Sequence, residues 1–142
     1  LTIQKFLAKL NLSPAKSNAD TCSFTATTPA GSSFDITNET VTINIGGAES
    51  AFTLSAKGRS ITATNSCKLA FTKKSQLWTL SASMKKGSWA STWSTSGVTN
   101  TTTPKAGITV KLPVYVNIGT NRFFADPSLT YIATTNKSGS LK

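Results

Sequence analysis

Apolar and polar residues alternate along this chain in short runs, the period-two pattern typical of β-strands with one buried face. The clearest runs are Cys22–Ala26, Val41–Ile45, Cys67–Phe71, Trp78–Met84, Ile108–Ile118 and Leu129–Ala133. Turn-forming residues separate the runs, and the Gly46-Gly47 pair predicts a hairpin between Val41–Ile45 and the segment around Phe52. The rhythm predicts an all-β fold, a β-sandwich of immunoglobulin-like or Greek-key type with seven to nine short antiparallel strands.

Two places depart from this alternation. Trp89 and Trp93 lie four residues apart, with Ser88 at a possible N-cap and Gly97 at a possible C′ position, so one short helix is expected over residues 88–96. Pro113 falls on the outward parity of the longest run. It cannot donate a ladder hydrogen bond, which indicates an edge strand or a bulge there.

The first twelve residues are compatible with either a helix or a strand. Five of their apolar residues are candidates for subunit contacts: Leu1, Ile3, Phe6, Leu7 and Leu10. Such a segment is too apolar for a free tail. It forms either the first strand of its own domain or an arm donated to the sheet edge of a neighbouring copy. Residues 13–142 are expected to form a single β-sandwich domain, whose polar, basic tail is loose from about residue 136.

The two cysteines, Cys22 and Cys67, occupy matching inward positions of two predicted strands. The pair is open to three interpretations: free core thiols, half of a metal site, or one disulfide. The chain contains no histidine and no CxxC, which argues against zinc. We expect the disulfide, and with it an oxidising, extracytoplasmic setting.

The net charge of +10 narrows the classes of partner. A basic surface suits nucleic acid, an anionic polysaccharide or an acidic cell surface, although Lys and Thr also serve simply as a solvated exterior. The positive residues are scattered, with pairs only at Lys73-Lys74 and Lys85-Lys86. No apolar run approaches the length of a membrane span.

Little in the chain indicates catalysis. The only acidic residues are Asp20, Asp35, Glu39, Glu49 and Asp126, and their positions beside turns and strand ends favour structural roles. Without histidine or closely spaced acids, neither a hydrolytic pair nor a metal site is apparent. We therefore expect no enzyme activity, no metal and no cofactor.

Trp89 and Trp93 are the best candidates for ligand stacking, together with Lys85 and Lys86 beside them. Aromatic faces next to cations bind sugars or bases. The alternative is that the two indoles plug one end of the sandwich, because each tryptophan buries on the order of 200 Å².

The chain also resembles an all-β module, largely uncharacterised, from predicted secreted proteins of planctomycetes and deltaproteobacteria-like bacteria. The resemblance runs through FDITNETVTINIGGAESAFTLSAKGRS, CKLAFTKK, KKGSWASTWSTSGVTN, ITVKLPVYVNIGTNRFFADPSLTY and NKSGSLK. Similar sequences carry Phe or Leu where Trp89 and Trp93 stand, and their usual pattern lacks a cysteine pair. The resemblance implies an extracellular location and a structural or surface role, and it transfers no catalytic or ligand residues.

These observations predict a non-enzymatic extracellular structural protein, such as a subunit of a pilus-like surface filament that self-associates through its N-terminal arm. Two alternatives remain open. One is a carbohydrate- or matrix-binding module that uses Trp89 and Trp93. The other is a binder of polyanions or nucleic acid driven by the positive charge.

Overall fold

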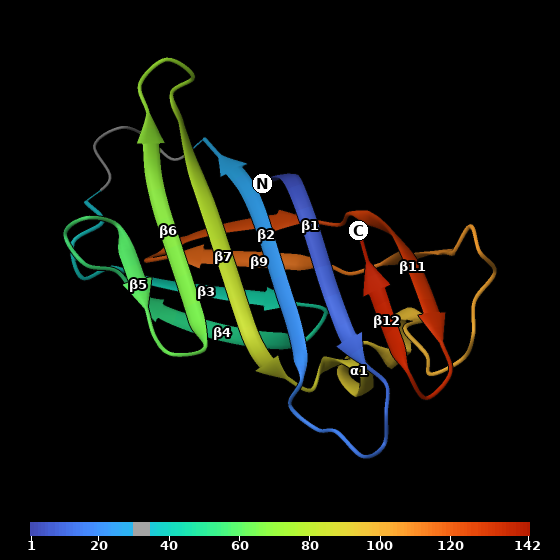
Figure 1. Cartoon of the computed structure of the whole chain (residues 1–142). Helices are drawn as coiled ribbons and strands as arrows, with labels where there is room; N and C mark the ends of the chain where they lie inside the picture. Colours follow the sequence, from blue (N-terminus) through green and yellow to red (C-terminus); the bar gives the residue numbers. More distant parts are fainter. Residues whose placement is uncertain (30–34) are drawn as a thin grey trace.

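A computed structural model describes residues 1–29 and 35–142 and shows two antiparallel sheets packed as a β-sandwich. The larger sheet has eight strands, which lie side by side in front of the smaller sheet in Figure 1. In spatial order they are β5 (Arg59–Ile61), β6 (Asn65–Thr72), β7 (Leu77–Gly87), β2 (Asp20–Thr28), β1 (Thr2–Asn11), β12 (Ser138–Leu141), β11 (Ser128–Thr134) and β8 (Ile108–Lys111).

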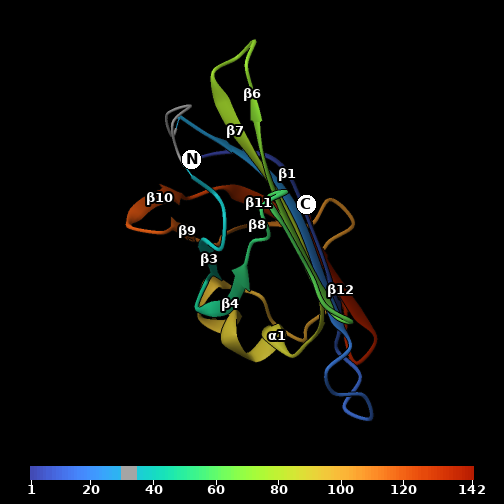
Figure 2. The ribbon, with the colours of Figure 1, turned by 90° about the vertical axis from the view of Figure 1, so that its left-hand side faces the viewer.

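The smaller sheet lies behind it and has four strands. Their order is β10 (Asn121–Ala125), β9 (Val114–Ile118), β3 (Thr40–Ile45) and β4 (Ala48–Thr53). The predicted hairpin is present: β3 and β4 are joined at Gly46-Gly47, where both glycines have positive φ. Figure 2 shows the larger sheet edge-on as an inclined layer, with the smaller sheet to one side of it.

The core lies between the sheets because inward positions carry the apolar residues that the alternation predicted. On β2, every second residue is buried, and the same holds for β7 from Trp78 to Met84. On β3 and β9, each inward side chain is essentially inaccessible to water. The predicted all-β sandwich is confirmed, and the described residues contain twelve strands rather than seven to nine.

Part of the difference comes from the run Ile108–Ile118, which is not one strand. It divides at Leu112-Pro113 into β8 in the larger sheet and β9 in the smaller one. Val110, Leu112 and Val114 are all buried, since the chain crosses the core while it changes sheets, and so the alternation continues through the break. Pro113 accepts a hydrogen bond from the Gly46 N–H at 2.8 Å, which fixes the crossing point.

The expectation of a loose C-terminal tail is wrong. Residues 138–141 form β12, which pairs with β1 on one side and β11 on the other. Leu141 is fully buried, and Gly139 lies so close to the Tyr131 ring that an added Cβ would approach it to 2.8 Å. Serine and glycine at three of the four positions concealed this strand, because only Leu141 carries an apolar signal.

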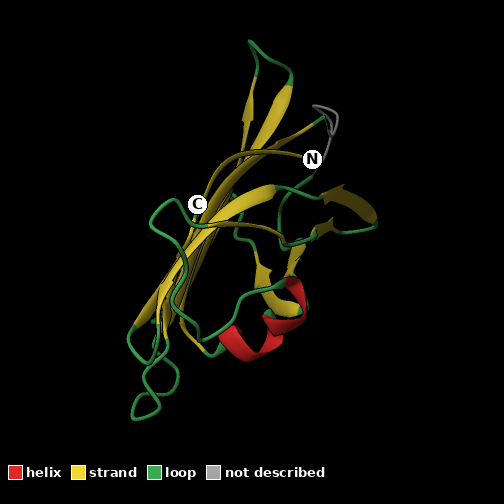
Figure 3. Cartoon of the chain, turned by 90° about the vertical axis from the view of Figure 1, so that its right-hand side faces the viewer, coloured by secondary structure: helices red, strands yellow, loops and turns green. Residues whose placement is uncertain are grey.

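The predicted helix is present as the single turn α1 (Trp89–Thr92), followed by the 3₁₀ turn η1 (Ser94–Ser96). Gly97 adopts the left-handed conformation expected of a C-terminal cap. Ser88 does not cap α1; its hydroxyl donates to Asn18 Oδ1 at 2.8 Å instead. The Trp89 N–H donates to the buried Asp20 carboxylate at 2.7 Å. Figure 3 shows this helical segment closing one end of the space between the sheets.

Candidate functional site

The two tryptophans of residues 88–96 belong mainly to the core. Trp93 is 1% exposed, and its indole N–H donates to the Ile45 carbonyl of the smaller sheet at 2.7 Å. Trp89 is half-buried and stacks on Trp93, with ring centroids 5.6 Å apart and planes 27° apart. An added Cβ at Gly87 would overlap the Trp89 ring, so this indole packs closely on the end of β7. Of the two interpretations, the geometry favours the plug.

Lys85 and Lys86 do not join the indoles in a stacking site. Lys85 is exposed on the outer face of β7, in register with Thr21 and, one strand further, with Lys9. Lys86 is the extra residue of a β-bulge and has a positive φ of 60°. The bulge separates the outward lysine from the helical turn that holds the tryptophans.

The expected disulfide is not formed. Cys22 on β2 pairs with Met84 of β7, and Cys67 on β6 pairs with Ala82 of the same strand, so β7 lies between the two cysteines. Two inter-strand spacings amount to about 10 Å, whereas a disulfide joins Cα atoms no more than about 7 Å apart. The parity prediction was correct, but inward parity does not reveal which strands are neighbours.

Burial raises the pKa of the Cys22 thiol and that of the Cys67 thiol to about 12 each. Both groups therefore stay protonated and unreactive near neutral pH. The extracytoplasmic setting expected from a disulfide loses this support.

The N-terminal residues considered for subunit contacts lie in the chain's own larger sheet. Phe6 and Leu10 are buried, while Leu1 and Ile3 pack against the core from its margin. Leu7 is half-buried on the outer face. Because β1 is hydrogen-bonded to β2 on one side and to β12 on the other, these residues form the first strand of the domain.

The acidic residues hold structure rather than converge. Asp20 accepts hydrogen bonds from the Asn11 and Trp89 N–H groups at 2.8 and 2.7 Å, and Asp126 pairs with Lys111 at 3.3 Å. The Thr37 backbone N–H and side chain hydrogen-bond to Asp35 and hold the pKa of this carboxyl below its usual value. Among the described residues, no three Cys, Asp or Glu side chains gather where they could hold a metal ion.

The chemically distinctive surface is the outer face of the larger sheet, and sequence reasoning did not find it. One row of side chains crosses five neighbouring strands in register. It runs from Lys5 on β1 through Thr25 on β2, Ser81 on β7 and Lys68 on β6 to Arg59 on β5. Because neighbouring strands lie about 4.8 Å apart, the outer cations are on the order of 19 Å from each other.

A second row lies next to it, two residues along each strand. It is formed by Leu7, Ser23, Ser83, Ser66 and Ile61. Its three central residues are serines, so short hydroxyl side chains again occupy the middle of the sheet.

Short side chains between long ones produce a hollow, which we call the hydroxyl groove. Its floor is made by the outward Ser and Thr residues of β2 and β7, and it has a volume of about 390 Å³. Lys5 borders it on the β1 side, and Lys68, Arg59 and the exposed Ile61 border it on the other. The groove therefore runs along the strands, with hydroxyl donors and acceptors beneath and cations on both margins.

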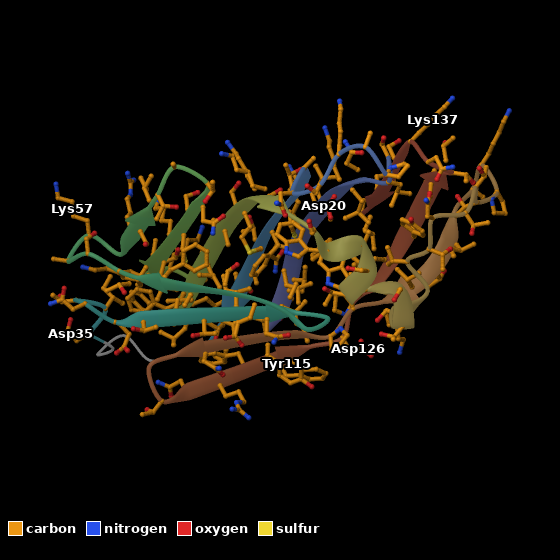
Figure 4. The ribbon with its side chains drawn as sticks, turned by 90° about the horizontal axis from the view of Figure 1, so that it is seen from below. Asp20, Asp35, Lys57, Tyr115, Asp126 and Lys137 are labelled. Atoms are coloured by element: carbon orange, nitrogen blue, oxygen red, sulfur yellow. The ribbon has the colours of Figure 1, made fainter. Side chains whose placement is uncertain are left out.

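Charge is segregated around the groove. In the described part of the chain, the lining of the groove includes Lys5, Arg59 and Lys68 and no acidic residue. Figure 4 shows nitrogen-tipped side chains extending from the side of the larger sheet, while Tyr115 lies on the opposite side of the molecule. The face is therefore complementary in charge to a polyanion.

The comparisons add no relative to these findings: the chain matches no family model, no curated protein and no solved structure. The resemblance to a secreted bacterial module stays a prediction. Within the part of the chain that the structure describes, no helix is long and apolar enough to cross a membrane.

Proposed function

We propose that this protein is a non-enzymatic binding protein that takes a chain of an anionic polysaccharide along the hydroxyl groove. The observation that carries the proposal is the row in which Lys5, Lys68 and Arg59 flank Thr25 and Ser81. Cations on the margins pair with sulfate or carboxylate groups, and hydroxyls on the floor exchange hydrogen bonds with sugar hydroxyls.

A polysaccharide suits the groove better than a nucleic acid does. Single-stranded nucleic acid is held by base stacking on aromatic side chains as well as by charge. Among the described residues of the larger sheet, the aromatic side chains all have inward parity: Phe6, Phe24, Trp78 and Tyr131 are buried, and Phe71 is partly buried. A hydroxyl floor offers no equivalent of stacking, but it matches the hydroxyl groups of a sugar.

This proposal takes the place of a filament assembled through the N-terminal segment. Donation of β1 to another copy would break its ladders with β2 and β12 and expose Phe6 and Leu10. Binding in the hydroxyl groove needs no such rearrangement. Anionic polysaccharides occur at cell surfaces and in extracellular matrices, so the proposed function includes a role outside the cell.

Two variants with the same net charge test the proposal. Lys5→Gln/Arg59→Gln/Lys68→Gln removes the cations of the groove, and Lys16→Gln/Lys105→Gln/Lys137→Gln removes three cations from loops. Each lowers the net charge from +10 to +7. Binding to a heparin hexasaccharide is measured by calorimetry, with single-stranded DNA of equal charge as the comparison ligand.

We expect the groove variant to bind heparin at least tenfold more weakly than the natural chain and the loop variant to lose less than threefold. Equal losses in both variants would contradict the proposal, because the binding would then follow net charge alone. Tighter binding of the DNA than of heparin would exclude the polysaccharide as the preferred ligand.

A further inference from the structure

The outer face of the smaller sheet carries a second, chemically different surface. Tyr115 on β9 and Phe124 on β10 are 41% and 50% exposed, and their ring centroids are 4.9 Å apart with planes 39° apart. They face each other as cross-strand partners and point away from the core. The tilted pair presents two ring faces to solvent on an otherwise polar sheet.

Packing explains why the rings touch but does not explain why they are exposed. An outward position on a solvated sheet needs only a polar side chain, as Thr42 and Asn117 show in the neighbouring row. Two large aromatic side chains left in water are the kind of feature that marks a binding surface.

Polar side chains lie beside the aromatic pair on the same face of the sheet. One row runs from Glu49 on β4 through Asn44 on β3 to Tyr115 and Phe124. Arg122 lies in the adjacent row, and its Nε–H donates to Asn117 Oδ1 at 3.3 Å. This hydrogen bond orients the guanidinium along the same surface.

A hollow with a volume of about 390 Å³ lies on this surface beside the aromatic pair. It is lined by Asn44, Glu49, Tyr115, Asn117 and Arg122. The hollow joins an aromatic face to two amides, one carboxylate and one guanidinium, which together supply donors and acceptors. Four of the five lining residues are polar, so the hollow offers one aromatic face with hydrogen-bonding groups around it.

The chemistry of this hollow matches a neutral pyranose sugar. The C–H face of such a ring packs on an aromatic side chain, while its hydroxyls pair with amides and charged groups. Glu49 and Arg122 carry opposite charges, so the surface favours neither a polyanion nor a polycation. This distinguishes it from the hydroxyl groove on the other face.

The area of the aromatic pair argues against a second copy of the chain as its occupant. Two aromatic side chains bury at most about 150–250 Å² each, whereas a stable interface needs about 800 Å² from each partner. The area of the two rings is closer to that of a contact with a sugar ring.

We propose that the Tyr115–Phe124 face is a second binding site, which takes a neutral sugar unit of a polysaccharide. The protein then has two ligand surfaces on opposite sides of one sandwich, one for an anionic chain and one for an uncharged chain. A molecule with this arrangement bridges two kinds of polymer without any self-assembly.

Affinity gel electrophoresis tests the second site, with laminarin, xylan, galactomannan and hydroxyethylcellulose as separate additives. Runs are made in 0.5 M NaCl, which suppresses binding at the hydroxyl groove. We expect at least one polymer to retard the natural chain and Tyr115→Ala/Phe124→Ala to weaken that retardation at least tenfold. Tyr115→Phe keeps the ring and is expected to stay within threefold of the natural chain.

Ile108→Ala serves as the matched control, since Ile108 is a 37% exposed apolar residue on β8 and lines neither hollow. It is expected to leave the retardation unchanged. Three results overturn the proposal: no polymer retards the natural chain, the double variant binds as before, or Ile108→Ala weakens binding equally. Sedimentation adds a fourth: an oligomer of the natural chain that the double variant converts to a monomer would show that a second copy covers the rings.

Discussion

The two outer faces of this sandwich are built by the same alternation and yet differ in chemistry. Outward positions of the larger sheet carry Ser, Thr and Lys, and they form a groove with cations on its margins. Outward positions of the smaller sheet carry two aromatic rings, amides and a balanced pair of charges. The inward positions of both sheets are mainly apolar, with Asp20 and Thr28 at the two ends of β2 as buried polar exceptions.

This difference shows which part of the sequence specifies the fold and which part specifies the surface. Inward residues determine that two sheets pack together, and almost any aliphatic set satisfies that requirement. Outward residues contribute little to the core, so the charged groove on one face and the aromatic pair on the other are the basis of the two proposed binding sites. Three sets of measurements test this comparison, and their expected effects decrease from the first to the third.

The largest effect concerns the two thiols, both of which belong to the larger sheet. Their pKa values of about 12 exceed the ordinary value of 9.0, so at pH 8 the thiolate fraction in the folded protein is lower by roughly a thousandfold. We expect a disulfide-exchange reagent to label the folded chain at least a thousandfold more slowly than the urea-unfolded chain. Fast labelling of the native protein would show that the larger sheet opens readily.

The same pKa shifts determine how the free energy of unfolding changes at alkaline pH. Folded-state pKa values above the unfolded ones stabilise the fold below pH 9, and this contribution is lost as the pH rises from 9 toward 12. Burial also raises the pKa of Tyr131, which acts in the same direction. Cys22→Ala/Cys67→Ala is expected to show a shallower loss of unfolding free energy over this range.

The second test substitutes Trp93, which links the two sheets. Its ring packs in the core, and its N–H reaches the smaller sheet at Ile45. Trp93→Ala is expected to lower the unfolding free energy by about 3–5 kcal/mol, measured by urea denaturation. Trp93→Phe keeps an aromatic ring and should cost less. If Trp93→Ala left stability unchanged, the two faces would not depend on one common core.

The third test compares how strongly salt weakens binding at each of the two outer faces. Three cations at the hydroxyl groove give a strong salt dependence, so a tenfold rise in NaCl is expected to weaken heparin binding by on the order of a hundredfold. Sugar binding at the Tyr115–Phe124 face is expected to change less than twofold. Both affinities are measured by calorimetry on the same sample, and a parallel decline would mean that both ligands use one surface.

The sequence predicted strands well where apolar residues alternate in long runs, as in β2, β3 and β7. It failed where the signal was short or ambiguous. β12 carries one apolar residue among serines and glycine, and the run Ile108–Ile118 conceals a change of sheet at Pro113. Parity alone shows which way a side chain faces, and it cannot reveal strand order, so Cys22 and Cys67 were paired across β7.

The candidate sites were harder to predict for the same reason. Lys5 is far from Arg59 and Lys68 in the sequence, and only the pairing of five strands aligns the three in one row. For the Tyr115–Phe124 pair, the sequence contained one usable indication. Tyr115 occupies an outward position in a run whose inward residues are all aliphatic. An aromatic residue on the solvent parity of a strand is therefore a useful indication of a surface site.

Amide chemical shifts during a titration with a heparin hexasaccharide test the central claim most directly. We expect the shifted amides to lie in β1, β2, β5, β6 and β7, around Lys5, Ser81 and Lys68, while β9 and β10 stay unchanged. Shifts that centre on the smaller sheet, or that spread over every lysine-bearing loop, would contradict the hydroxyl groove as the site of anionic polysaccharide binding.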